Sequence, residues 1–430
     1  MLVRRAPAIP SWPRVTEVNW AGNYTYRAER LHLPSTLEQV REIVAAASRV
    51  RVLGSRHSFN DIGDSEELLT LAALPADVVV DRAAGTVSLG AGITYGELAG
   101  ALHDEGVALH NMASLPHISV AGAVATATHG SGEAKGNLAT AVAALEIVTS
   151  SGEVVTASRG DADFDGLVVG LGALGAVTRL TLDVEPAYEV RQRVFEGLPW
   201  DALCEHFDEI SASGDSVSVF TRWRETADQV WVKSRVTDAP EHVRGDLFGA
   251  SAATVDRHPI LGMDPANSTP QLGRPGPWSD RLSHFRLGFT PSSGEELQSE
   301  FLVPREHAVA AIKSMRAMGD RIRPVLQVCE IRMIAADRLW MSPQYGRDTI
   351  GLHFTWMPEP DAVAPVLADV EAALAAFEAR PHWGKLFFAD AATIAALYER
   401  LPDFVRLIER LDPRGAFRNP WLQARVLGVG

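Results

Sequence analysis

The first segment able to do chemistry is a short apolar run that ends in a glycine and a histidine, VLGSRHS at residues 52–58. A turn of small polar residues exposes successive backbone N–H groups, which can hold the oxygens of a pyrophosphate without a lysine. The same turn presents the side chain of His57. Taken alone, the segment fits equally well a loop histidine that caps the end of a strand, so it leaves the role of His57 open.

A second segment, ASLPHISVAGAVATATHGSG at residues 113–132, consists almost entirely of small residues from position 119 onward. Small side chains let another body lie against the backbone. Tight packing of a helix on a strand is the alternative, but the Ser and Thr content and the closing His-Gly-Ser-Gly favour a hydrogen-bonded ligand. His117 and His129, taken singly, are more typical of structural histidines.

Polar residues alternate with apolar ones in three later segments, ELQSEFLV, LQVCEIRMI and GLHFTWM. Strand periodicity puts these pairs each on one face: Gln298 with Glu300, Glu330 with Arg332, and His353 with Thr355. Lys385 follows in HWGK. A solvated sheet face is the plain alternative. A polyol, however, needs such a mixture, because each hydroxyl both donates and accepts a hydrogen bond.

A glycine pattern at Gly170, Gly172 and Gly175 matches GxGxxG, the dinucleotide fingerprint of Rossmann folds. That fingerprint requires a helix directly behind it. Here Leu180 and Leu182 alternate with polar residues, which indicates a strand. We therefore do not expect a Rossmann site.

Length and composition set the frame for these motifs. The chain has 430 residues, which favours two domains, and no apolar run is long enough to span a bilayer. Its formal net charge of -14 disfavours nucleic acid as a partner. Cys204 and Cys329 form neither a disulfide framework nor a zinc site, and we expect no metal and a cytoplasmic location. The arginine pair at residues 4–5 lacks the apolar segment of an export signal.

The expected strands and helices alternate irregularly along the chain, which indicates an α+β fold rather than a doubly wound parallel sheet. Capping boxes are expected at Ser35 with Glu38 and at Thr94 with Glu97, and a hairpin at residues 144–156. Further strands are expected at residues 216–223 and 229–236, and helices at residues 305–318, 361–378 and 403–411. We place a first domain at residues 1–185, a second with a mixed sheet at 186–390, and a tail at 391–430 that returns to the first.

The turn at His57 and the small-residue segment together resemble the FAD-binding domain of the vanillyl-alcohol oxidase family, also called PCMH-type. The similarity is closer still to the alditol and xylitol oxidases and runs from about residue 19 to residue 423. The segments that carry it include NWAGNYTYRAERLHLPSTLEQV, VLGSRHSFNDI, NMASLPHISVAGAVATATHGSG, GALGAVTRLTLDVEPAYE, FTPSSGEELQSEFLVPRE, CEIRMIAADRLWMSPQYGRDT, RPHWGK and LDPRGAFRN. Many relatives have Gly where Arg56 stands, but xylitol oxidases share the Arg.

This resemblance implies one FAD per chain, bonded covalently to His57, and oxidation of the C1 hydroxyl of a sugar alcohol to the aldose, with O2 reduced to H2O2. It implies the following cofactor contacts: Gly54, Ser55, Arg56, His57, Ser58, Ser114, His117, Ser119, Gly122, Thr126, His129, Gly130, Gly172, Gly175, Val177 and Asn419. It implies these substrate contacts: Ser114, Gln298, Glu330, Arg332, Thr355 and Lys385. Catalytic roles fall to Arg332, Lys385, Glu330 and His353.

We expect a monomer whose partners are a polyol and O2. Three alternatives stay open: a sugar-1,4-lactone oxidase, a dehydrogenase that excludes O2, and a flavin- or carbohydrate-binding protein without turnover. The lactone oxidases lack the matched LQSEF and CEIR segments, which ranks them second.

Overall fold

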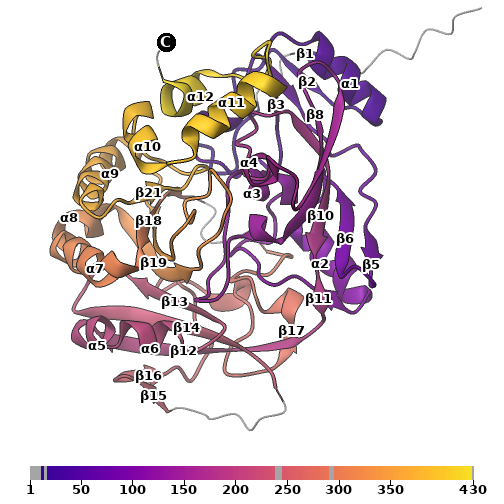
Figure 1. Ribbon diagram of the computed structural model, residues 1–430. Helices are drawn as coiled ribbons and strands as arrows, with labels where there is room; N and C mark the ends of the chain where they lie inside the picture. Colours follow the sequence, from indigo (N-terminus) through magenta and orange to yellow (C-terminus); the bar gives the residue numbers. More distant parts are fainter. Residues whose placement is uncertain (1–10, 14–16, 238–244, 290–294, 429–430) are drawn as a thin grey trace, which may run out of the picture.

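The computed structural model describes residues 11–13, 17–237, 245–289 and 295–428. The arginine pair at residues 4–5 and residues 290–294 of one family segment lie outside these ranges. Within them the chain forms an α+β fold in which residues up to about 186 and residues 189–381 build separate sheets (Figure 1).

The N-terminal part, as far as the structure describes it, contains two small sheets and a two-stranded pair of β7 and β11, together with four α-helices. One sheet has the order β1-β2-β4-β3 and the other the order β5-β6-β10-β8-β9. The strands are β1 (Ser11–Pro13), β2 (Arg30–His32), β3 (Val50–Val52), β4 (Glu67–Leu69), β5 (Val79–Asp81), β6 (Thr86–Gly90), β7 (Val107–Ala108), β8 (Val142–Val148), β9 (Val154–Ser158), β10 (Ala176–Asp183) and β11 (Glu185–Pro186). The helices are α1 (Leu37–Ala46), α2 (Tyr95–Asp104), α3 (Val120–Ala125) and α4 (Phe164–Leu167).

Local sequence signals explain several of these boundaries. The Thr94–Glu97 capping box is present at the start of α2, and β8 and β9 form the expected hairpin. The capping box expected at Ser35 was wrong by one residue. Helix α1 is capped by Thr36, whose Oγ1 accepts from the N–H of Gln39 at 3.2 Å, and the Gln39 side chain accepts from the N–H of Ser35 at 2.8 Å. Gln39 thus takes the place expected for Glu38.

The glycine pattern of residues 170–175 leads directly into β10, so no helix follows it. This agrees with the prediction that it is not a dinucleotide fingerprint. Gly175 has φ of 144°, and a Cβ there would lie 2.5 Å from the carbonyl oxygen of Val148. Close packing on β8 therefore explains this glycine.

A ten-stranded sheet dominates the second part, in the order β15-β16-β12-β14-β13-β19-β20-β18-β21, with β17 paired to β12. Its strands are β12 (Glu189–Pro199), β13 (Ser216–Thr221), β14 (Thr226–Arg235), β15 (Asp246–Leu247), β16 (Ala250–Ala252), β17 (Gly276–Pro277), β18 (Leu297–Pro304), β19 (Leu326–Ile334), β20 (Thr349–Trp356) and β21 (Arg380–Pro381). Every described pairing in this sheet is antiparallel, so the expected mixed sheet was wrong. The reason is that β20 is inserted between β18 and β19, which run in the same direction but never pair.

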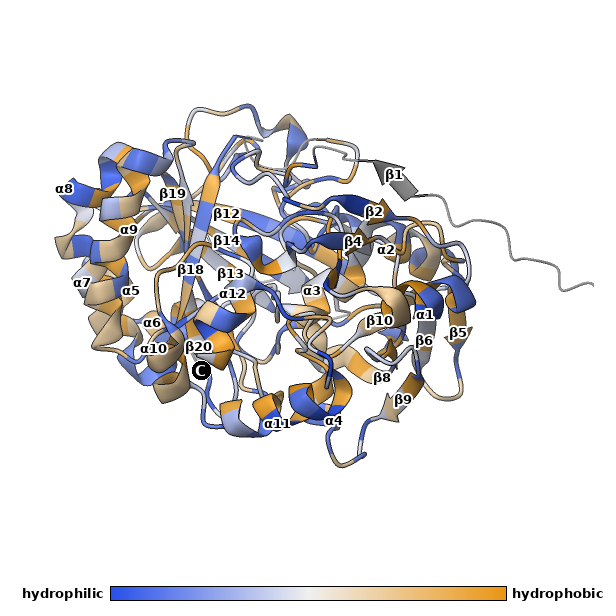
Figure 2. Cartoon of the chain, turned by 90° about the horizontal axis from the view of Figure 1, so that it is seen from above, coloured by the Kyte–Doolittle hydropathy of each residue, from blue (hydrophilic) through white to orange (hydrophobic). Residues whose placement is uncertain are grey.

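Helices cover one face of this sheet on the outside of the molecule (Figures 1 and 2). They are α5 (Trp200–Glu205), α6 (Phe207–Ser211), α7 (Ala308–Ala317), α8 (Gly319–Ile322) and α9 (Pro360–Ala375). Their surfaces alternate between hydrophobic and hydrophilic stretches, as expected for helices that bury one side. The opposite face of the sheet turns toward the N-terminal part.

Of the C-terminal helices, α10 (Ala391–Leu397) lies beside the second part near β21, and α11 (Leu401–Leu411) and α12 (Pro420–Leu422) run back over the N-terminal part. Asn419 caps α12 and donates to the carbonyls of Asp61, Ile62 and Asp64. The buried guanidinium of Arg51 on β3 donates to carbonyls of Ile62, Leu171, Gly172 and Phe417. One side chain thus ties together four separate segments.

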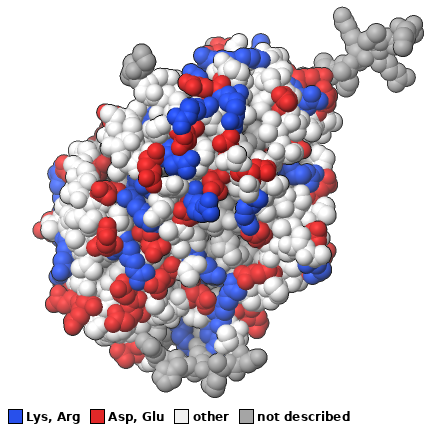
Figure 3. All heavy atoms as spheres, viewed as in Figure 1, with Lys and Arg blue, Asp and Glu red and all other residues white. Residues whose placement is uncertain are grey.

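The face of the molecule seen in Figure 3 carries acidic and basic side chains interspersed, without a large field of one sign. Among the helices that the structure describes, none has both the length and the apolar character needed to cross a bilayer.

Candidate active site

A cavity of about 220 Å³ lies between the N-terminal part and the face of the large sheet that its helices leave uncovered. The two motifs of the N-terminal half line one end of it, and residues of β18, β19 and β20 line the other. The structure therefore brings together in one space segments that are more than 200 residues apart in the sequence.

The N-terminal end of the cavity is built by the turn at residues 54–58 and the start of α3. Ser119 holds the two together, because its N–H donates to Ser55 Oγ at 2.9 Å. A Cβ on Gly54 or Gly122 would lie 2.4 or 2.6 Å from Ser119 Oγ. A side chain at either position would displace the Ser119 hydroxyl, and without one the exposed backbone leaves a cradle for a large ligand.

His57 sits at the edge of this cradle with an unusual environment. Neither of its ring nitrogens makes a hydrogen bond of standard geometry with the described chain, although both are buried. Burial lowers the pKa of His57 to about 4, and the nearby His117 adds to this effect. The imidazole is therefore neutral and has a free nitrogen, as covalent attachment to a cofactor requires.

The opposite wall is a row of polar side chains across adjacent strands. Glu330 on β19 pairs with His353 on β20, and His353 pairs with Glu300 on β18. Thr355 pairs in the same way with Gln298. All residues of these three strands are buried, so the face is not the solvated sheet surface that was the alternative interpretation. Buried polar groups of this kind need partners, either within the protein or from a bound ligand.

Glu300 joins the two cations of this wall. Its carboxylate accepts from Lys385 Nζ at 2.7 Å and from Arg332 Nη2 at 3.1 Å. Gly351 stands beside it on β20, and a Cβ at that position would lie 2.8 Å from Glu300 Oε1. Burial alone would raise the pKa of Glu300, but the charges of Lys385, His129 and Arg332 hold it well below its usual range. Glu300 is therefore an anion.

Glu330 is held by a second group of partners. It accepts from His284 Nε2 at 3.0 Å and lies 3.4 Å from His353 Nδ1 and 3.5 Å from Arg332 Nη1. Burial opposes ionisation, but Arg332 and His284 keep the pKa of Glu330 well below its usual range. Because a carboxylate only accepts, both His nitrogens that face it carry hydrogen.

His353 is thereby fixed in one tautomer. Its Nδ1 faces Glu330, and its Nε2 is buried without a hydrogen-bond partner in the described chain. Burial lowers the pKa of His353 to about 4, and Lys385 contributes to the same effect. Nε2 is consequently an unprotonated acceptor in the lining of the cavity.

The two cations at the wall have different environments. Burial lowers the pKa of Lys385, although Glu300 opposes this. The pKa of Arg332 is raised, since Glu330 and Glu300 outweigh its burial. Arg332 also reaches across the cavity, where its Nη1 donates to Ser114 Oγ at 3.2 Å. Two positive donors thus converge at one end of the polar wall.

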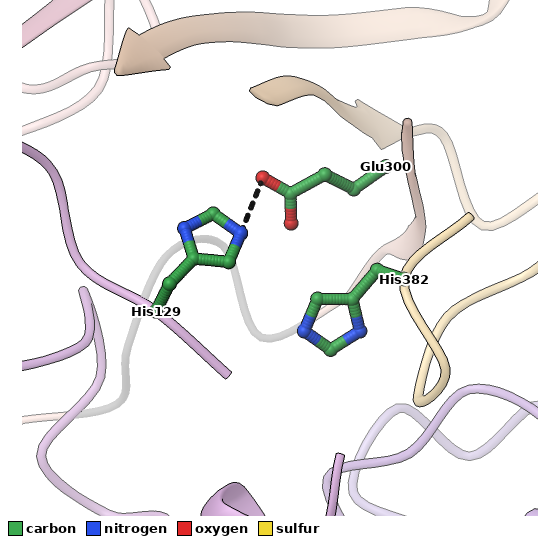
Figure 4. Close-up of side chains that lie close together, drawn as sticks. All are labelled: His129, Glu300 and His382. Atoms are coloured by element: carbon green, nitrogen blue, oxygen red, sulfur yellow. Dashed lines mark ion pairs between the residues drawn. The ribbon is translucent and has the colours of Figure 1, made fainter. Parts of the chain in front are cut away.

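Figure 4 shows a cluster that the sequence did not suggest, formed by His129, Glu300 and His382. Their potential ligand atoms lie within 4.8 Å of one another, and His129 Nε2 is 3.2 Å from Glu300 Oε1. The charge of Glu300 is already balanced by Arg332 and Lys385. A divalent cation here would face those two cations, which disfavours a metal centre and assigns the cluster to the ion-pair network.

Most of the residues expected at the site line this cavity. They are Gly54, Ser55, Arg56, His57, Ser58, Ser114, Ser119, Gly122, Thr126, His129, Gly172, Gln298, Glu330, Arg332, His353, Thr355 and Lys385. His117, Gly130, Gly175, Val177 and Asn419 are outside its lining. Gly130 packs on the backbone of Met112, where a Cβ would lie 2.4 Å from the carbonyl oxygen. For Gly130, Gly175 and Asn419, contacts within the protein account for the residue.

The sequence interpretation assigned no role to Glu300, His284 or His382. Glu300 carried a signal, because it shares a strand face with Gln298. His284 lies on a loop with no periodicity and reaches the site because the N–H groups of His284 and Phe285 donate to the carbonyl of Ser114. No sequence pattern pointed to that contact.

Comparisons of the sequence and the fold with known proteins identify relatives of this chain. A family of FAD-binding domains matches residues 28–158, and the D-arabinono-1,4-lactone oxidase family matches residues 294–425. The chain is 50% identical over 410 residues to an alditol oxidase from a Streptomyces species, which covers 94% of this chain and 97% of the relative. It is 28% identical over 432 residues to an L-gulono-1,4-lactone dehydrogenase of Mycobacterium tuberculosis, covering 95% and 98%.

Among solved structures, a cholesterol oxidase from B. sterolicum superimposes with a TM-score of 0.79 at 15% identity, covering 97% of this chain and 99% of that one. At this identity the likeness shows the fold alone. The Streptomyces relative, which is 50% identical and matches nearly the whole length of both chains, shows the family as well as the fold. This chain belongs to the alditol oxidase family of FAD-binding oxidoreductases.

Proposed function

We propose that the protein oxidises the C1 hydroxyl of alditols such as xylitol and sorbitol to the aldose, with FAD as cofactor and O2 reduced to H2O2. The observation that carries this proposal is the buried polar wall of β18, β19 and β20, which shares one cavity with the His57 turn. The half-identical relative named alditol oxidase supports it.

The chain's own residues divide the chemistry as follows. Arg332 and Lys385 donate to the C1 oxygen and stabilise its developing negative charge. His353 accepts the hydroxyl proton at Nε2, while Glu330 stabilises the imidazolium through Nδ1. FAD, when bound in the cradle beside His57, would supply the hydride acceptor and the link to O2. Ser114, Gln298 and Thr355 pair with the other hydroxyls and set which carbon faces the flavin.

We propose further that the flavin is bonded covalently to His57. The absence of a hydrogen bond of standard geometry at either ring nitrogen and the neutral state of the imidazole support this link. Acid precipitation of the purified protein should leave the yellow colour in the pellet, and peptide mapping should find the flavin on the peptide that holds His57. Free FAD in the supernatant would contradict the link but not the cofactor.

The proposed reaction is tested with a series of alditols from glycerol to sorbitol, with peroxide as the readout and the product identified by NMR. Each wall group left unpaired by a short substrate costs about 1–3 kcal/mol. kcat/KM should therefore rise steeply from glycerol to five- and six-carbon alditols, with oxidation at C1 only. A flat series, or a ketose product, would contradict the placement of the wall.

Sugar-1,4-lactone oxidation is the second candidate, because residues 294–425 match the D-arabinono-1,4-lactone oxidase family. A lactone in the same assay discriminates between the two. We expect turnover of the lactone to be weak, since a closed ring presents fewer free hydroxyls to the wall.

A further inference from the structure

The segment at residues 17–24 is packed directly against the turn that carries His57. The N–H of Trp20 donates to the carbonyl of Arg56 at 2.8 Å. Asn19 Nδ2 donates to the carbonyl of Ser58 at 2.9 Å, and Asn23 Nδ2 donates to that of Phe59 at 2.9 Å. Three of the four carbonyls from residue 56 to residue 59 are thus held by one short segment.

The same segment fixes an unusual backbone conformation. Arg56 has φ of 63°, in the left-handed region that a non-glycine residue adopts only at a cost. Its guanidinium is paired with Glu17, with Nη2 at 2.7 Å from Oε2. The pair and the three carbonyl contacts offset this cost and keep the turn in the shape that presents His57.

Trp20 acts on the His57 ring itself. The two rings stack with centroids 5.2 Å apart and planes inclined by 19°. A reactive histidine is ordinarily oriented by a hydrogen bond to one of its nitrogens. Neither nitrogen of His57 makes a hydrogen bond of standard geometry with the described chain, although the backbone of Ser55 lies close enough to act on the ring. The stack with Trp20 therefore adds a second restraint on rotation of the imidazole.

We propose that residues 17–24 form a clamp that prepares His57 for covalent attachment of the flavin, with Trp20 orienting the imidazole. The clamp rests on the covalent link proposed above. Attachment replaces one C–H bond of the flavin 8-methyl group and the imidazole N–H by a C–N bond. The two electrons and two protons released pass to the flavin ring, and O2 then takes them up as hydrogen peroxide.

The test measures attachment and not turnover. The full chain is purified from flavin-limited cells and incubated with FAD, and the flavin in the acid pellet is followed over time beside the total bound flavin. Trp20→Leu should still bind FAD but attach it more slowly by on the order of tenfold or more, because a reacting nitrogen out of position loses rate steeply. Trp20→Phe, which keeps a ring for stacking, should recover much of the rate.

Tyr24→Phe is the matched control. It lies in the same segment, but its hydroxyl donates to Asp64 and not to the turn, so its attachment rate should equal that of the unchanged chain. Attachment by Trp20→Leu at the unchanged rate, or by Trp20→Phe no faster than by Trp20→Leu, would overturn the clamp. Should Trp20→Leu fail to fold, Asn23→Ala decides instead. It releases the Phe59 carbonyl and should slow attachment severalfold, and an unchanged rate would again overturn the clamp.

The two proposals fail in different ways. If the unchanged chain holds only free FAD, the link to His57 is wrong and the clamp falls with it. If the unchanged chain is covalently loaded and the clamp variants load equally fast, the clamp alone is wrong.

Discussion

Glu300 bridges Lys385 and Arg332, two cations of the polar wall, with Nζ at 2.7 Å from Oε2 and Nη2 at 3.1 Å from Oε1. The three side chains come from β18, from β19 and from the loop after β21. Those of Glu300 and Arg332 are buried, and that of Lys385 is 12% exposed. One buried carboxylate therefore sets both the position of the two donors and the protonation of the lysine. The reaction needs the lysine charged, so this relationship predicts a pH effect.

Glu300→Gln should move the alkaline limit of flavin reduction to lower pH. Burial lowers the pKa of Lys385, and Glu300 is the largest influence that raises it. Without the carboxylate, Lys385 loses its proton at a lower pH, and activity falls as pH rises through that pKa. Stopped-flow reduction by xylitol across pH measures the limit.

Glu371→Gln on α9 is the matched control, because its carboxylate accepts only from the backbone of Phe388 and Ala389, outside the cavity. Its alkaline limit should stay in place. An unchanged limit in Glu300→Gln would mean that Lys385 is not kept charged by Glu300.

Lys385→Met should lower kcat and kcat/KM by similar factors, on the order of a hundredfold, because the ammonium acts on an oxygen that becomes anionic only during oxidation. Steady-state peroxide formation with xylitol gives both constants. Lys313→Met, at an exposed position of α7, should leave them unchanged. A rise in KM alone would show that Lys385 binds only the ground state.

Gly351→Ala should reduce activity severely with little loss of stability. The new Cβ would lie 2.8 Å from Glu300 Oε1 and 3.4 Å from the side chains of Ile334 and Leu302. The carboxylate must move, and the Arg332 pair moves with it. Gly100→Ala in helix α2 meets nothing within 4 Å and should raise stability by about 0.5–1 kcal/mol with unchanged activity. Equal activity in both variants would contradict the tight fit at Glu300.

Stability should fall as pH is lowered from 6.5 to 4. His284 and His353 are buried and have pKa values near 4, chiefly because of burial. The unfolded chain binds their protons at about pH 6.5, whereas the folded chain does not, so acid favours unfolding by at most about 3 kcal/mol for each ring. Thermal unfolding across pH measures the slope.

Replacing one of these rings should make that slope shallower. His284→Gln removes one proton-binding group from the difference between the unfolded and folded states. His103→Gln, in the last turn of α2, should leave the slope as it is. A slope that does not change in His284→Gln would mean that this ring is protonated in the folded protein.

Sequence alone gave the α+β class, the exclusion of a Rossmann site and most residues of the cavity. Period-two alternation in β18, β19 and β20 identified Gln298, Glu330, Arg332, His353 and Thr355, because side chains of a strand alternate between faces whatever the surrounding fold. Gly122 could be identified for a similar reason, because it lies in a run of small residues, and such a run marks the close approach of another group.

Only the tertiary structure decided which of these groups form hydrogen bonds and ion pairs with one another. Whether a polar strand face is solvated or buried depends on what packs over it, and here the N-terminal part covers it. Insertion of β20 between β18 and β19 put Glu300 and Glu330 on either side of His353, a register that no local pattern encodes. The contacts of His284 with Glu330 and of Trp20 with His57 join loops to distant segments. Loops have no helix or strand periodicity from which such contacts could be predicted. Residue type and strand face follow from the local sequence, but partners follow from long-range packing. In this protein the partners keep Glu300 and Glu330 ionised and fix the tautomer of His353.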